Sequence, residues 1–341
     1  MFCLAAGKEV MRFYCVRSTK CTRVGNLANQ KLKERRFAMK KLAFVLSIMV
    51  LLVSAPAIQA DGPTVPEGFE VTVLASDLEA PKGIISPLHR AGAGPFGHYL
   101  YVAEADADDI VTVDKAGAGA NLFADNVGDF PVGVAFFGGP FGNNLYVGNA
   151  GGGGIVKVDP SGAVSPFALA GMRIAGLDFG RGHYGPNLYA GEWSPGNIHQ
   201  VDSQGNATLF ANVPGTQTRY LKFSHGGAFG TFLYFTDFLT GDIYKVDDLG
   251  AATLFASTGT PSLEGLDFSP GGAFGHFLYA GSLNTGEIFR VAPDGSVELW
   301  GSGFTGAADI HFEPGKRGGF TMYVSDGQNP GHVYAISKAK K

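Results

Sequence analysis

The amino-acid sequence predicts an all-β fold, a six-bladed β-propeller of four-stranded antiparallel blades. A Leu-Tyr or Met-Tyr pair recurs at intervals of 43 to 45 residues, at Tyr101, Tyr146, Tyr189, Tyr234, Tyr279 and Tyr323. A repeat of this length marks an array in which each copy is one supersecondary unit. Gly, Pro and Asp interrupt each copy roughly every ten residues, as they do where short strands are joined by tight turns.

The copy from Leu263 to Ala307 illustrates the four strands expected in each blade. They cover residues 266–268, 277–280, 288–291 and 297–300. Pro293-Asp294-Gly295 separates the last two strands, and such sequences form hairpin turns because Gly tolerates a positive φ. Four strands at a period of about 45 residues match a propeller blade.

The fourth strands share a large aromatic residue at their centre: Phe123, Phe167, Phe210, Phe255 and Trp300. We expect these strands to be apolar on both sides, as in a blade packed between two neighbours. The aromatic rings would then fill the space between blades.

The sixth copy lacks a fourth strand, because the chain ends in lysines soon after residues 333–336. Near the other end of the chain, residues 71–75 (VTVLA) have the pattern of residues 252–256 (ATLFA), which form a fourth strand. We therefore expect the N-terminal strand to complete the sixth blade, which removes an open sheet edge.

The first 60 residues are expected to lie outside the fold. Met39-Lys40-Lys41, the apolar run 42–53 and the small residues up to Ala60 form a secretory signal peptide over residues 39–60. It is too short and wrongly flanked for a membrane span. Residues 1–38 precede a normal signal start, so we interpret them as translated leader. Residues 61–341 then form a propeller domain that is secreted or periplasmic.

Removal of residues 1–60 leaves a strongly acidic chain. That segment holds 11 of the 26 Lys and Arg residues, 2 of the 30 Asp and Glu residues, and all three Cys. Residues 61–341 carry 15 basic and 28 acidic residues, a formal net charge of −13. Such a surface repels nucleic acids and anionic lipid. We expect a monomer without disulfides whose partner is a small molecule or an extracellular protein.

Two stretches resemble a known group of propellers. Residues 66–75 (PEGFEVTVLA), followed by Pro81-Lys82-Gly83, and residues 265–272 (GLDFSPGG) are similar to phrases of the senescence-marker-protein/gluconolactonase and NHL-repeat superfamily. The resemblance covers residues 66–337 and implies a six-bladed propeller with its ligand at one end of the central channel. The superfamily includes metal-dependent lactonases, lyases, quinoprotein sugar dehydrogenases and binding proteins with no known reaction, so the fold carries over better than the activity.

The residues that begin the innermost strands are the first candidates for a site at the channel mouth. They are Lys82, Val132, Ala175, Arg219, Glu264 and Ala308, followed in turn by Gly83, Gly133, Gly176, Tyr220, Gly265 and Asp309. The resemblance implies that lactonases carry a Glu, an Asn and an Asp at such positions and hold a divalent cation there. Here Lys82 stands in place of the Glu, Glu264 in place of the Asn, and Asp309 is offset by one. The cations Lys82 and Arg219 in the ring disfavour a bound metal ion.

The mixed ring at the mouth consists of Lys82, Arg219, Tyr220, Glu264 and Asp309. It is either a polar pocket for an anionic or hydroxylated small molecule or a set of ion pairs and capped loops that satisfy one another. The two interpretations differ in whether the polar groups have partners within the chain.

The loops between the second and third strands carry a polar residue three positions after each repeat tyrosine: Glu104, Asn149, Glu192, Asp237, Ser282 and Asp326. Recurrence in every blade favours a structural role, in which the side chain accepts backbone N–H groups. Glu192 and Asp237 are nevertheless retained as candidate ligand-binding residues. Trp193 either forms an apolar or sugar-stacking wall with Phe238 or packs against the neighbouring loop.

Glu104, Asp106 and Asp108 form an acidic loop in the first copy. It is either a weak surface calcium site or a solvated loop, since it lacks the Gly and the distal Glu of a calcium-loop signature. Calcium is therefore the one cofactor considered, and no metal site is assigned.

These observations favour an exported propeller that binds a small molecule or partner at its channel mouth, with no assigned reaction. A metal-dependent lactonase, hydrolase or lyase is the alternative. The sequence contains no Gly-x-Ser-x-Gly elbow and no His-Glu-x-x-His zinc motif. The enzyme would need three or four oxygen ligands that converge near the axis.

Overall fold

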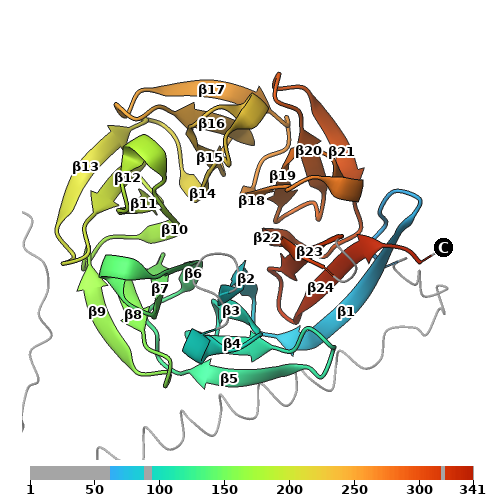
Figure 1. Ribbon diagram of the computed structural model, residues 1–341, viewed down its shortest axis with the longest axis horizontal. Helices are drawn as coiled ribbons and strands as arrows, with labels where there is room; N and C mark the ends of the chain where they lie inside the picture. Colours follow the sequence, from blue (N-terminus) through green and yellow to red (C-terminus); the bar gives the residue numbers. More distant parts are fainter. Residues whose placement is uncertain (1–61, 88–93, 316–318, 341) are drawn as a thin grey trace, which may run out of the picture. The chain divides into compact units, whose positions relative to one another are not determined.

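The propeller consists of six four-stranded sheets arranged around a central axis (Figure 1). The computed structural model describes residues 62–87, 94–315 and 319–340. The expected leader and signal peptide, residues 1–60, lie outside this range. None of the helices within it is both long and apolar enough to cross a membrane. The predicted six-bladed, all-β fold is confirmed.

Blades 1 to 5 each use four consecutive strands, ordered from the axis outward. Blade 1 contains β2 (Pro81–Ile85), β3 (Leu100–Glu104), β4 (Asp109–Val113) and β5 (Ala120–Ala124). Blade 2 contains β6 (Pro131–Phe137), β7 (Asn144–Asn149), β8 (Gly154–Val158) and β9 (Val164–Ala168). Blade 3 contains β10 (Ile174–Phe179), β11 (Leu188–Glu192), β12 (Asn197–Val201) and β13 (Ala207–Asn212). Blade 4 contains β14 (Thr218–Phe223), β15 (Leu233–Asp237), β16 (Asp242–Val246) and β17 (Ala252–Ser257). Blade 5 contains β18 (Leu263–Phe268), β19 (Leu278–Ser282), β20 (Ile288–Val291) and β21 (Val297–Gly301).

Blade 6 joins the two ends of the propeller. It contains β22 (Ala307–Pro314), β23 (Phe320–Asp326), β24 (Gly331–Lys338) and, outermost, β1 (Phe69–Leu78). The β1 strand lies beside β24 (Figure 1). The two strands pair antiparallel, with Val71 opposite Ile336. The predicted closure by the N-terminal strand is therefore confirmed.

The recurring tyrosine anchors a short helix in each of blades 1 to 5. These one-turn 3-10 helices are η2 (Gly94–Phe96), η3 (Gly139–Phe141), η4 (Gly182–Tyr184), η5 (Gly227–Phe229) and η6 (Gly272–Phe274). The Tyr146 hydroxyl donates a hydrogen bond to the Phe141 carbonyl, 2.7 Å away. The same bond recurs in the other four blades. Each such tyrosine is buried, so the Leu-Tyr pair and the aromatic residue of the helix form one structural unit.

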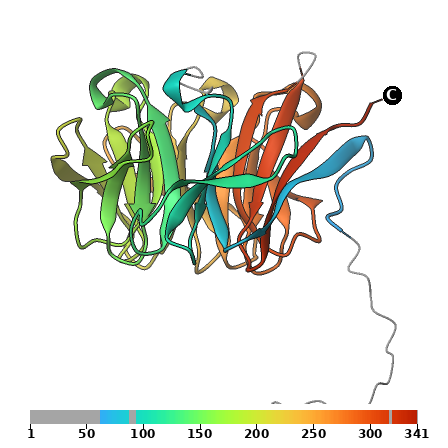
Figure 2. The same cartoon turned by 90° about the horizontal axis from the view of Figure 1, so that it is seen from below.

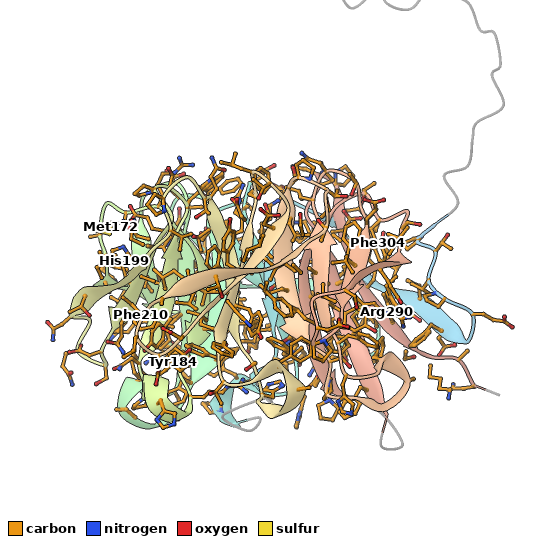
Figure 3. All side chains as sticks on the ribbon, turned by 90° about the horizontal axis from the view of Figure 1, so that it is seen from above. Met172, Tyr184, His199, Phe210, Arg290 and Phe304 are labelled. Atoms are coloured by element: carbon orange, nitrogen blue, oxygen red, sulfur yellow. The ribbon has the colours of Figure 1, made fainter. Side chains whose placement is uncertain are left out.

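The two ends of the axis carry different loops. One end, the helix face, holds η2 to η6 and the connections between first and second strands (Figure 2). The other end, the mouth face, holds the connections into the innermost strands and those between second and third strands. Figure 3 shows Met172, which precedes β10, toward one end and Tyr184, in η4, toward the other.

The outermost strands carry apolar residues on both sides, as predicted, but only one side is packed, so the prediction of burial between two neighbours on both sides is wrong. Leu122, Leu209, Leu254 and Leu299, each next to a central aromatic residue, are 57% to 62% exposed, whereas Trp300 is buried. Successive side chains of a strand point to opposite faces. In the outermost strand, one of these faces meets solvent.

Candidate functional site

A β-bulge at the start of every innermost strand shapes the mouth face. The register between first and second strands shifts between Thr218 and Leu221 in blade 4 and between Leu263 and Leu266 in blade 5. Corresponding shifts occur in the other four blades. A bulge inserts one residue and redirects side chains. The bulged positions are those of the predicted ring.

Glycine follows the ring residue in four blades because adjacent inner strands approach closely there. A Cβ on Gly133 would lie 2.1 Å from the carbonyl oxygen of Ala175 in the next blade. A Cβ on Gly265 would lie 2.4 Å from the Cα of Asp309. Blades 4 and 6 instead carry Tyr220 and Asp309 at this position, and both side chains are buried.

Tyr220 bridges two blades that are not neighbours. Its strand belongs to blade 4, but its hydroxyl donates to the carbonyl of Val132 in blade 2, 3.2 Å away. Burial, with the nearby carboxyl groups of Asp309 and Glu264, raises the pKa of Tyr220 well above its usual value. Tyr220 is therefore a neutral bridge across the channel.

Asp309 links blade 6 to blade 1. Its Oδ2 accepts a hydrogen bond from the Ile84 amide at 3.0 Å, and its Oδ1 accepts one from the Ile310 amide at 2.8 Å. Burial raises the pKa of Asp309 to about 7, although both amide bonds favour the charged form. Both oxygens are occupied by backbone, so Asp309 is a structural link between blades.

Two hydroxyl residues outside the predicted set hold the backbone of the ring. Thr236 accepts a bond from the Tyr220 amide at 3.2 Å and donates to the carbonyl of Glu264 in the next blade. Ser325 makes the equivalent two bonds between blades 6 and 1. Both stand two positions after a repeat tyrosine, where the other blades have Ala103, Gly148, Gly191 and Gly281. This departure from the repeat is a sequence signal that identifies them.

Arg219 is buried between two aromatic rings. Its guanidinium carbon lies 3.5 Å from the ring centroid of Trp193 and 4.1 Å from that of Phe238. Its Nη2 lies 3.6 Å from Glu264 Oε1, which is an ion-pair distance but too long for a hydrogen bond. Among the residues that the structure describes, Arg219 Nε and Glu264 Oε2 have no hydrogen-bond partner. The structure thus brings Arg219, Glu264 and Trp193 together.

An apolar rim surrounds this group on the mouth face. Trp193, Phe238 and Leu283 occupy the same position in blades 3, 4 and 5, four residues after the repeat tyrosine, where the other blades have Ala105, Ala150 and Gly327. All three are half-buried. The Phe130 ring of blade 2 lies 6.5 Å from the Trp193 ring, measured between centroids. We call Phe130, Trp193, Phe238 and Leu283 the apolar rim.

Lys82 completes the ring from blade 1. It is 4% exposed, and its Nζ donates to the carbonyl of Gly327 in blade 6, 3.2 Å away. Burial lowers the pKa of Lys82; the nearby Glu264 opposes this shift and Arg219 adds to it. The ring therefore contains a buried amine and a buried guanidinium near the carboxylate of Glu264.

The polar residues of the second-to-third-strand loops include several with the expected structural role. In blades 1, 4 and 6 the carboxylate accepts a hydrogen bond from a backbone amide of the loop that leads into the same blade. Asp237, for example, accepts from the Gln217 amide at 2.8 Å. Glu192 instead accepts from the Asn197 side chain at 2.8 Å and lies 3.1 Å from the His199 ring nitrogen. Because these carboxylates are engaged by neighbours, we leave Glu192 and Asp237 outside the site proposed below.

The described residues do not fit a divalent cation. In residues 62–87, 94–315 and 319–340, no three His, Cys, Asp or Glu side chains are grouped so that they could hold a metal ion. In the acidic loop, Glu104 and Asp108 accept hydrogen bonds from backbone amides, and Asp106 accepts one from the Asn329 side-chain amide. At the mouth, the carboxylate of Glu264 faces a guanidinium instead of further oxygen ligands.

Comparisons with known proteins reveal similarity only at the level of structure. No protein-family model matches the chain, and a search of curated proteins found no match. A gluconolactonase from Xanthomonas campestris is 14% identical, with a TM-score of 0.63 over 82% of this chain and 95% of its own. The calcium-binding protein regucalcin from Agrobacterium tumefaciens is 16% identical, with a TM-score of 0.58 over 80% of this chain and 96% of its own. Virginiamycin B lyase from Staphylococcus aureus is 12% identical, with a TM-score of 0.53 over 79% of this chain and 99% of its own.

At these identities the similarity concerns the fold alone. It spans most of each solved chain, and both gluconolactonase and regucalcin are among the proteins matched. The chain is therefore a six-bladed propeller similar in fold to gluconolactonase and regucalcin, as the repeat and the sequence of residues 66–75 predicted.

Proposed function

We propose that the protein binds a small, oxygen-rich anion at the mouth face, with Arg219 as the group that binds its carboxylate. One observation carries this proposal: the buried Arg219 side chain forms no hydrogen bond to any residue in the described part of the chain. A guanidinium has five N–H donors, and buried donors without acceptors cost free energy. A carboxylate matches its planar geometry.

Glu264 and the apolar rim favour a ligand that also carries hydroxyl groups and carbon surface. Glu264 Oε2 is a buried acceptor without a partner in the described residues, so it suits a ligand hydroxyl. The half-buried Trp193 and Phe238 are the surfaces that such a ligand meets first. Aromatic rings of this kind present apolar faces to sugar-like molecules.

The backbone of Phe130 fixes one part of the apolar rim. Phe130 has a φ of 56°, and Ala80 and Ser262 share this positive φ at the equivalent position of blades 1 and 5, so the conformation belongs to the repeat. The Phe130 amide donates a hydrogen bond to Asp108 Oδ1 at 2.9 Å, and its carbonyl accepts one from the Ala150 amide at 2.9 Å. These two bonds hold the loop that places the Phe130 ring beside Trp193.

The helix-face end of the axis is less suited to a ligand. The cavity there has a volume of about 20 Å³ and is lined by Asp178, Lys222, Asp267 and His311, among others. A space of this size holds about one water molecule. The mouth face is our choice for the binding site because Arg219 Nε and Glu264 Oε2 lie there without a partner in the described chain.

A thermal-shift titration with gluconate, glucose and glucono-δ-lactone tests the proposal, because the three share a six-carbon skeleton and only gluconate is charged. We expect gluconate to raise the melting temperature in a concentration-dependent manner, since a ligand of the folded state stabilises it. Neutral glucose should have little effect. Accelerated hydrolysis of the lactone would instead support the lactonase alternative.

Variants assign the effect to Arg219. Arg219→Gln should weaken gluconate binding by about tenfold or more, since hydrogen bonds to charged groups contribute about 1.5–3 kcal/mol. Arg290→Gln is the matched control, because Arg290 pairs with the exposed Glu298 on blade 5. Equal stabilisation by glucose, or unchanged gluconate binding in Arg219→Gln, would refute the proposal.

We further propose that the propeller acts outside the cytoplasm. The support is the signal-like segment at 39–60 and the net charge of −13 over residues 61–341. N-terminal sequencing of the protein from the periplasm and medium of a bacterial host should give a mature chain that begins shortly after Ala60. A cytoplasmic protein with residues 1–38 still attached would contradict export.

A further inference from the structure

Lys82 differs from an ordinary structural lysine in how its charge is compensated. Its single hydrogen bond goes to the Gly327 carbonyl, and it forms no ion pair with any residue that the structure describes. Lys115 shows the usual arrangement, with its Nζ 2.7 Å from Glu313 Oε1. A buried ammonium normally has three acceptors or a carboxylate partner. Lys82 has one neutral acceptor.

Compared with an exposed lysine, this environment disfavours the ammonium ion and lowers the pKa of Lys82. Moving a charge into a poorly solvated site is costly unless an opposite charge compensates it. Glu264, the carboxylate that opposes this effect most, is already 3.6 Å from the Arg219 guanidinium. Burial is the main cause of the lowered pKa of Lys82. The charge of Arg219 adds to it, and Glu264, Asp106 and Asp326 oppose it without reversing it. A neutral lysine amine is a nucleophile toward carbonyl carbon.

We propose that Lys82 forms a reversible imine with a carbonyl group of the ligand, and that the ligand is an oxo acid whose carboxylate binds Arg219. This inference rests on the anion site proposed above. The ring positions of Lys82 and Arg219 belong to blades 1 and 4, which lie opposite each other in a six-bladed ring. The carbonyl and the carboxylate of the ligand must therefore be separated by several carbons. An acid with an aldehyde at its other end meets this requirement.

The bond changes balance without any oxidant or reductant. The amine nitrogen attacks the carbonyl carbon with its lone pair and gives a carbinolamine. The carbinolamine oxygen then leaves as water, and a C=N bond replaces the C=O bond. Glu264 stands in the same ring with one oxygen that has no partner in the described chain, so it is the group placed to pass protons between nitrogen and oxygen.

Reductive trapping of the full-length protein tests this chemistry. Succinic semialdehyde with cyanoborohydride is the probe, butanal is the probe without a carboxylate, and succinate is the probe without a carbonyl. Hydride addition to the imine gives a stable secondary amine that intact-mass measurement and peptide mapping detect. We expect one adduct per chain, located at Lys82, and at least tenfold slower labelling by butanal. Succinate should compete with the semialdehyde.

The pH profile separates a reactive amine from an accessible one. At neutral pH, Lys82 should be labelled faster than exposed lysines such as Lys338, and this advantage should shrink as the pH rises toward 10, where exposed lysines also lose their protons. Lys82→Met should abolish the specific adduct, whereas Lys338→Met should retain it. Peptide mapping of the labelled protein with its natural sequence locates the adduct without any variant. A folding defect in Lys82→Met therefore does not affect the test.

The outcomes distinguish the two proposals. If succinate stabilises the protein through Arg219 but no adduct forms at Lys82, the imine is refuted and the anion site stands. If butanal labels Lys82 as fast as the semialdehyde and Arg219→Gln changes nothing, the imine stands and the anion site is refuted. Adducts spread over surface lysines, with none favoured, would overturn the assignment of Lys82.

Discussion

Tyr220 donates its hydroxyl to the carbonyl of Val132, 3.2 Å away, and so joins blade 4 to blade 2 across the propeller axis. Blades 1, 2, 3 and 5 have Gly at the position of Tyr220. In those blades, neighbouring inner strands fill the space that a side chain would need. Tyr220 therefore replaces the glycine of the repeat with a side chain that joins two non-adjacent blades.

Loss of the Tyr220 hydroxyl should destabilise the propeller modestly, and loss of its ring should destabilise it strongly. Tyr220→Phe leaves the Val132 carbonyl without its donor, which costs about 1 kcal/mol of unfolding free energy. Tyr220→Gly restores the repeat but opens a cavity, at a cost of roughly 3–5 kcal/mol. Urea denaturation measures both. Tyr99→Phe, at a residue that is 45% exposed, is the control and should be neutral. A Tyr220→Phe protein as stable as the original would contradict this bridge.

The close approach of inner strands predicts a sharp difference between two glycines of blade 2. A Cβ at Gly133 would lie 2.1 Å from the Ala175 carbonyl oxygen, whereas Gly138 has no atom within 4 Å of its Cβ position. Gly133→Ala should lower the unfolding free energy by about 1–3 kcal/mol, since overpacking a filled site costs this much. Gly138→Ala, with a φ of −98°, should be neutral or slightly stabilising. Equal stability of the two variants would mean that the inner strands can separate.

Asp309 should make the protein less stable as the pH rises through the mildly acidic range. Burial raises the pKa of Asp309 to about 7 in the folded state, against about 4 for an unfolded chain. Between these values the folded state binds more protons, so the unfolding free energy falls with rising pH and levels off above about 7. Asp309→Asn should flatten this slope.

Asp109 should contribute a pH dependence of the same sign. Burial, together with Glu104, raises the pKa of Asp109 to about 7. Asp109→Asn should reduce the slope of the unfolding free energy against pH. Combining it with Asp309→Asn should give a smaller slope than either substitution alone. Denaturation curves recorded from pH 4 to pH 8 provide the comparison. The exposed Asp77→Asn is the control. A slope that is the same in all variants would show that neither carboxyl group titrates as described.

Calcium should leave the melting temperature of the protein unchanged, because Glu264 faces the cations Lys82 and Arg219 instead of further oxygen ligands. Lys82→Glu removes one of these cations and adds a carboxylate to the ring. A calcium-dependent stabilisation is therefore expected in this variant rather than in the unaltered chain. Stabilisation of the unaltered protein by calcium, reversed by a chelator, would contradict our assignment and favour the metal-dependent alternative.

Much of the architecture was predictable from the sequence because it is repeated and local. The tyrosine recurs since each blade needs its hydroxyl on the carbonyl of the short helix, as in Tyr146 and Phe141. The strand at residues 71–75 was identified because it has the pattern of an outermost strand. The exposed leucines, such as Leu122, were not predicted, because alternation within a strand does not reveal which face meets solvent.

The candidate site was predictable only as a set of positions. The repeat singled out Lys82, Arg219 and Glu264 because they replace small or apolar residues of other blades. It could not reveal that Arg219 lies between Trp193 and Phe238, since these contacts join residues from different loops and blades. Nor did it separate Asp309, whose oxygens bind backbone amides, from Glu264, whose Oε2 has no partner in the described chain.

The sequence by itself determined the number of blades, their order and the strand that closes the ring, because a period of 43 to 45 residues and a missing fourth strand admit one arrangement. The tertiary structure alone decided which polar groups are satisfied. That depends on neighbours from other blades: Val132 for Tyr220, Ile84 for Asp309 and Gly327 for Lys82. Hydrogen bonding between blades is set by closure of the ring, and closure brings together residues that no local pattern connects.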